Sequence, residues 1–92
     1  MSYSEDHLIK LAQDKPQDLL KILLNPRSTP VDLTLGIEIL ANESKDEDML
    51  LLALRRLLSH INAIVREGAV ISVGSFYIET KPPQDILDRV KE

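Results

Sequence analysis

Two short stretches of this 92-residue chain are nearly identical although they lie far apart. Residues 15–20 read Lys-Pro-Gln-Asp-Leu-Leu and residues 82–87 read Pro-Pro-Gln-Asp-Ile-Leu, an offset of 67. About half of that offset relates the middle of the chain to its first part. A shift of 34 places Leu20, Lys21, Leu23 and Leu24 on Leu54, Arg55, Leu57 and Leu58, and Val31, Leu35, Ile37 and Ile39 on Val65, Ala69, Ile71 and Val73. Such a period predicts a repeated helix pair, in which each pair covers an apolar face of its neighbour.

Start signals place six helical segments along the chain. Ser4 caps residues 5–13, Pro16 opens a second helix, and Thr29 with Pro30 opens a third. Ser44 and Glu47 form a capping box before a fourth helix, and Asn62 caps a fifth that runs to about residue 78. A last short helix follows Pro82-Pro83. Residues 62–78 are rich in β-branched side chains, so a strand is an alternative there.

Composition favours helices as well. Aromatic residues make up only 3% of the chain, whereas apolar residues make up 43% and charged residues 28%. The core must therefore consist of Leu, Ile, Val and Ala, which suits closely packed helices in one folded domain. We predict an all-α fold of five to six helices.

Residues 65–74, Val-Arg-Glu-Gly-Ala-Val-Ile-Ser-Val-Gly, resemble the second-helix signature of HEAT-like (armadillo-type) repeats, where a valine-arginine pair precedes alanine and a small-apolar-glycine ending. Residues 31–40 keep the apolar positions but have Asp32 in place of the usual arginine and lack the closing glycine. The resemblance covers roughly residues 16–92 and implies a short right-handed α-α superhelix. It divides residues 1–92 into an N-terminal capping helix (1–14), a first pair (16–43), a second pair (45–79) and the start of a third pair or a C-terminal cap (83–92). An irregular helical bundle is an alternative, and a tetratricopeptide array ranks lower because its aromatic positions have no counterparts here.

Several function classes find no support in the sequence. The formal net charge is −4 and the basic residues are scattered, which disfavours nucleic acid as a partner. The chain has no cysteine, and His7 and His60 have no metal-ligand spacing, so we expect no metal or other cofactor. No nucleophile elbow or phosphate-binding glycine loop is present, which argues against an enzyme. The polar N-terminus and the lack of an apolar run of about 18 residues predict a cytoplasmic protein without a membrane segment.

The prediction that remains is a non-enzymatic module or scaffold that binds a protein along its second helices. Arg66, Ser72 and Tyr77 are the candidate partner-binding residues, and Asp32 and Arg66, at equivalent repeat positions, are predicted to form an inter-repeat ion pair. The alternatives are a structural or capping fragment of a longer helical-repeat protein and a nucleic-acid-binding scaffold of the same family. If Ile86, Leu87 and Val90 are exposed and do not pack on the preceding pair, a missing continuation or a partner surface is indicated.

Three further features carry structural expectations. Gly68 and Gly74 are predicted to be points of close helix contact. Phe76 is predicted to be in the core, while Tyr77 is either buried or a partly exposed anchor for a partner. Acidic residues gather before the fourth helix, where they either complement the helix dipole or contact a basic partner; they are Glu43, Asp46, Glu47 and Asp48.

Overall fold

The computed structural model describes residues 3–91 and contains six α-helices and, within that range, no strand. They are α1 (Glu5–Asp14), α2 (Pro16–Leu24), α3 (Pro30–Glu43), α4 (Glu47–Leu57), α5 (Ala63–Phe76) and α6 (Gln84–Lys91). The all-α prediction with five to six helices is therefore confirmed. The strand alternative for residues 62–78 is wrong, because α5 covers nearly all of that segment.

The helix starts follow the capping signals, with one exception. The side chains of Ser4, Thr29 and Asn62 accept hydrogen bonds from backbone N–H groups of α1, α3 and α5. The predicted capping box at Ser44 is wrong, because Asp46 caps α4 and accepts from the N–H of Met49 at 3.1 Å. Ser44 instead accepts a hydrogen bond from the N–H of Asp46 at 3.1 Å and supports the turn before the cap.

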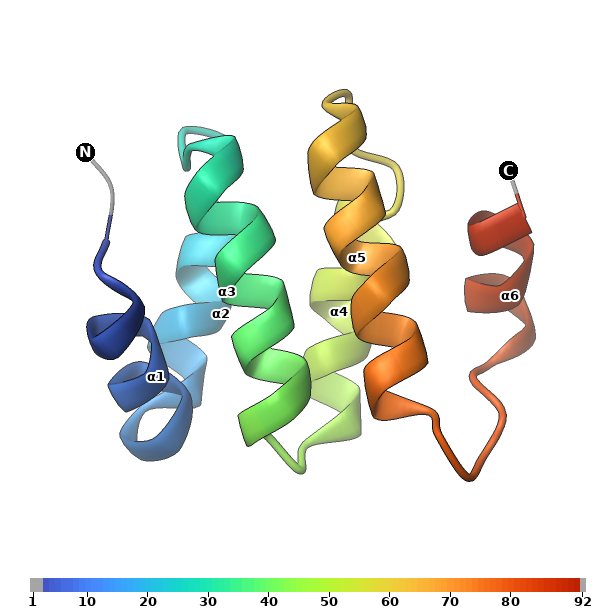
Figure 1. Cartoon of the computed structure of the whole chain (residues 1–92), viewed down its shortest axis with the longest axis horizontal. Coiled ribbons are helices and arrows are strands. Elements are labelled where there is room, and N and C mark those ends of the chain that lie inside the picture. The colour runs from blue at the N-terminus through green and yellow to red at the C-terminus, as the bar shows by residue number, and fades with distance from the viewer. Residues whose placement is uncertain (1–2, 92) are drawn as a thin grey trace.

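The six helices form two layers, seen in Figure 1, with α3 and α5 side by side in front of α2 and α4. The α1 helix lies at one end of the array, against α2 and α3, and α6 lies at the other end. The core between the layers is aliphatic, as the composition predicted. Its fully buried side chains include Leu8, Leu19, Leu23, Ile37, Leu40, Leu50, Leu54, Leu57, Val65 and Ile86.

Gly68 lies where α5 meets α3. A Cβ atom at this position would be 2.8 Å from Cγ2 of Thr34 and 3.5 Å from the Thr34 Cα, so a side chain would hold the helices apart. The close-contact prediction is thus confirmed for Gly68. It is wrong for Gly74, where a Cβ atom would meet nothing within 4 Å in the described part of the chain.

The repeat of 34 residues predicts the wrong rotation of α5 about its own axis relative to α3; these are the second helices of the two predicted pairs. Val31 is 63% exposed but Val65 is fully buried, while Ile37 is fully buried and Ile71 is 51% exposed. The burial patterns of α3 and α5 match at a shift of 32 instead, which aligns Leu33, Gly36, Ile37, Leu40 and Ala41 with Val65, Gly68, Ala69, Ser72 and Val73, all buried. Two residues correspond to about 200° around a helix, so α5 is turned by more than half a revolution from the predicted orientation.

The α6 helix is attached to the preceding part of the chain by apolar and polar contacts. Ile86 is fully buried in the core, Val90 is half-buried and packs against the core, and Leu87 is half-buried, so none of the three is exposed. Arg55 of α4 donates from Nε to Asp85 at 2.8 Å, and Arg89 donates to the hydroxyl of Ser59 at 2.9 Å.

Candidate functional site

The predicted ion pair between Asp32 and Arg66 does not form: no salt bridge joins them within 4.0 Å in the described residues. Asp32 is buried on α3 and accepts a hydrogen bond from the N–H of Tyr3 at 3.0 Å. Arg66 is exposed, and its Nη1 donates to the carbonyl oxygens of His60 and Ile61 at 2.7 and 3.0 Å. The cause is the different rotation of α5, which directs Arg66 to the α4–α5 connection.

Arg66, Ser72 and Tyr77 do not lie together on one surface. Ser72 is buried, and its hydroxyl donates to the Gly68 carbonyl at 2.8 Å, within α5 itself. Tyr77 is also buried, whereas Phe76, which was predicted to be in the core, is only half-buried and packs against it. Of the three predicted partner-binding residues, only Arg66 is accessible to a partner.

Tyr77 has a structural partner 30 residues away. Its hydroxyl donates to Oε2 of Glu47 at 2.6 Å, which joins the end of α5 to the start of α4. Burial, and then this hydrogen bond, raises the pKa of Tyr77 above its usual value. One carboxylate of the acidic cluster thus holds helices together, and Asp46 serves as a helix cap.

The first candidate site is a groove between α3 and α5, which we call the outer groove. It is lined by Pro30, Val31, Thr34, Leu35, Glu38 and Ile64 and has a volume of about 310 Å³. Val31 and Ile64, at 63% and 65% exposed, form its edges, and Glu38 supplies its single charge. It is an apolar recess with one acidic side chain.

The apolar surface continues along α5. Of the eight large apolar side chains that are exposed among residues 3–91, five lie in residues 61–78: Ile61, Ile64, Val70, Ile71 and Ile78. Only two of the 14 residues of α5, Arg66 and Glu67, are charged. A helix that is apolar on all sides is normally buried on all sides, yet one side of α5 is uncovered.

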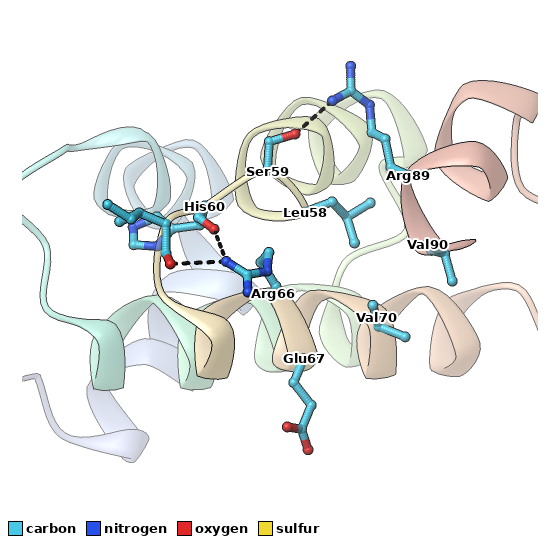
Figure 2. Close-up of a pocket in the computed structure, with 9 residues that line it drawn as sticks. Leu58, Ser59, His60, Arg66, Glu67, Val70, Arg89 and Val90 are labelled. Atoms are coloured by element: carbon cyan, nitrogen blue, oxygen red, sulfur yellow. Dashed lines mark hydrogen bonds between the residues drawn. The ribbon is translucent and has the colours of Figure 1, made fainter. Parts of the chain in front are cut away.

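The second candidate site lies between the α4–α5 connection, α5 and α6, and we call it the α5–α6 cleft. It has a volume of about 670 Å³ and is lined by Leu58, Ser59, His60, Ile61, Arg66, Glu67, Val70, Arg89 and Val90. In Figure 2 Leu58 lies between the two arginines, Val70 and Val90 lie to one side of them, and the side chain of Glu67 points away from them. This cleft combines aliphatic and cationic groups.

Neither site coincides with a metal-binding cluster of side chains in the described part of the chain. Within residues 3–91, no group of three or more His, Cys, Asp or Glu side chains lies close enough to hold a metal ion. The ring of His7 stacks on Tyr3 with centroids 5.6 Å apart, and Nδ1 of His60 accepts a hydrogen bond from the N–H of Asn62 at 3.0 Å. In the same part of the chain, no helix is long and apolar enough to cross a bilayer.

Sequence reasoning missed the outer groove because Val31 was counted among the repeated apolar positions expected to be covered by the neighbouring helix pair. The available signal was the shortage of charge in residues 63–76, where only Arg66 and Glu67 are charged. Comparison of the chain with protein-family models, with curated proteins and with solved structures yields no match. The HEAT-like resemblance therefore stays a prediction.

Proposed function

We propose that this protein is a non-enzymatic protein-binding module whose partner docks in the outer groove and on the neighbouring exposed side of α5. The observation that carries the proposal is the uncovered apolar side of α5 next to the groove, which bears Ile64 and Ile71. Exposed apolar surface of this kind is typical of sites that another protein covers. HEAT-like stacking and a cytoplasmic location belong to the same proposal.

The groove favours a partner with an aliphatic anchor. Its lining is apolar except for Glu38 and Thr34, so an aliphatic side chain inserted there would leave few polar groups without water. Glu38 favours a basic residue beside that anchor, because a carboxylate at the edge of a groove attracts an opposite charge.

The test is capture of partners from native lysate by three forms of the immobilised protein, followed by an affinity measurement with the purified partner. Val31→Asp places a charge on the groove, and it suits the first turn of α3, where acidic residues interact favourably with the helix dipole. Leu52→Asp is the matched control, because Leu52 is 54% exposed on α4 and does not line the groove.

We expect Val31→Asp to weaken the partner's affinity by about tenfold or more, as for truncation of a central interface residue, and Leu52→Asp to leave it unchanged. Circular dichroism melts of both variants check that the fold is retained. The proposal fails if the wild-type protein captures no partner that Val31→Asp loses, or if both variants lose the partner equally.

A further inference from the structure

Two arginines line the α5–α6 cleft without an acidic partner. Arg66 and Arg89 both line it, and neither has a carboxylate within 4.0 Å among residues 3–91. Asp85 of α6 is bound to Arg55. Glu67 also lines the cleft, but its side chain points away from both arginines (Figure 2), so two arginines without a carboxylate partner are a local exception in a chain with a net charge of −4.

The hydrogen bonds of these arginines are incomplete. Arg66 uses Nη1 on two backbone carbonyls, and Arg89 uses Nη1 on the hydroxyl of Ser59, all of them uncharged acceptors. The Nε of Arg89 is buried and has no acceptor within the described residues. A buried donor without an acceptor is unfavourable, and a carboxylate is the acceptor that a guanidinium binds best.

The cleft also has aliphatic side chains beside the arginines. Leu58 is buried at its base, and Val70 and Val90 lie on facing helices, α5 and α6 (Figure 2). An occupant that matches both features has an aliphatic side chain that contacts these residues and a carboxylate at each end that pairs with an arginine. The cleft's volume of about 670 Å³ accommodates several side chains.

We propose that the α5–α6 cleft is a second binding site that accepts an acidic peptide segment of a partner protein, with aliphatic residues between two carboxylates. Arg66 and Arg89 each bind one carboxylate, and Val70 and Val90 contact the aliphatic residues. This site is separate from the outer groove, so it does not depend on the function proposed above.

The experiment uses two synthetic peptides of about 12 residues with the same leucine positions, one with glutamate and the other with lysine at every polar position. Binding to the full chain is measured by fluorescence anisotropy at low and high salt. We expect the glutamate peptide to bind at least tenfold more tightly than the lysine peptide and to lose affinity as salt rises.

Variants of the protein locate the site. Arg89→Gln is expected to weaken the glutamate peptide about fivefold, the effect of one partly exposed charge pair. Arg56→Gln removes the same charge from an exposed position on α4 outside the cleft and should change nothing. Val31→Asp, which alters the outer groove, should also leave the peptide's affinity unchanged.

A gain of binding guards against a variant that simply unfolds. Arg89→Glu should reverse the preference, so that the lysine peptide binds more tightly than the glutamate peptide. The Nε–Hε nuclear magnetic resonance signals of Arg66 and Arg89 should shift when the glutamate peptide is added to the wild-type protein. The inference is overturned if neither peptide binds, if both bind equally, or if Arg89→Gln and Arg89→Glu leave the preference for the glutamate peptide unchanged. It is also overturned if the arginine signals shift with protein concentration alone, since the occupant would then be a second copy of the chain.

Discussion

Alanine at position 68 should destabilise the protein, although alanine is the better helix former. The added Cβ atom would lie 2.8 Å from Cγ2 of Thr34, closer than the about 3.5–4.0 Å at which two carbon atoms attract each other. Relief requires α3 and α5 to move apart, because the Thr34 Cα is only 3.5 Å away and belongs to the backbone of α3. Overpacking of this kind costs about 1–3 kcal/mol. The gain in helix propensity returns about 1 kcal/mol, so the expected net loss is about 1 kcal/mol.

Gly74→Ala is the matched control on the same helix. Nothing in the described residues lies within 4 Å of its added Cβ atom, so it should gain the propensity of about 0.5–1 kcal/mol without a penalty. Urea unfolding followed by circular dichroism should therefore separate the two variants by about 1–3 kcal/mol, with Gly74→Ala the more stable. In a Thr34→Ala background, which removes Cγ2, the separation should shrink. Equal stabilisation by both alanines would refute the close contact between α3 and α5.

Three further predictions concern individual hydrogen bonds. Burial and the hydrogen bond to Glu47 raise the pKa of Tyr77. The protonated Tyr77 therefore stabilises the fold fully below about pH 10, and this contribution is lost as the pH rises above that value. Between pH 9 and 11 wild type should lose more thermal stability than Tyr77→Phe. The hydrogen bond from Arg55 lowers the pKa of Asp85. The stabilisation by the Asp85 carboxylate is therefore present above about pH 4 and is lost as the pH falls through the lowered pKa. The carboxyl carbon signal of Asp85 should titrate below about 3.9, and the stability of Asp85→Asn should fall less in acid than that of wild type. Asn62→Ala should lose about 1 kcal/mol in urea unfolding, because the Asn62 side chain accepts from the first N–H groups of α5, whereas Asn62→Asp should retain most of the stability. The Tyr77 assignment is contradicted if wild type and Tyr77→Phe lose equal thermal stability at alkaline pH. The Asp85 assignment is contradicted by a titration midpoint at or above about 3.9, and the Asn62 assignment by an Asn62→Ala variant that is as stable as wild type.

Most of the fold could be predicted because its determinants are local. Thr29 followed by Pro30, and Asn62 before an apolar segment, fix where α3 and α5 begin, and both caps form as expected. The error at α4 is also local. Ser44 and Asp46 are both good capping residues two positions apart, and the pattern of the capping box favoured the wrong one.

The site could not be predicted because it depends on how α5 is rotated. Apolar residues occur on every side of α5, so the spacing of Val65, Ala69, Ile71 and Val73 does not reveal which side is buried. Matching the sequence at a shift of 34 therefore placed Ile71 in the core and Arg66 beside Asp32, and both placements are wrong. Tyr77 was equally uncertain, because the partner of its hydroxyl, Glu47, is 30 residues away.

The two ends of the molecule are tethered very differently. Lys15 alone separates α1 from α2, and it is both the C-cap of α1 and the N-cap of α2. The angle between these helices is thus set by one residue's φ and ψ, here −141° and 65°. By contrast, residues 77–83 separate α5 from α6, so many torsions contribute to where α6 lies. Sequence drift or insertion can reposition α6 and reshape its cleft, whereas lengthening the corner at Lys15 by a single residue would rotate α1 off the core that Leu8 fills.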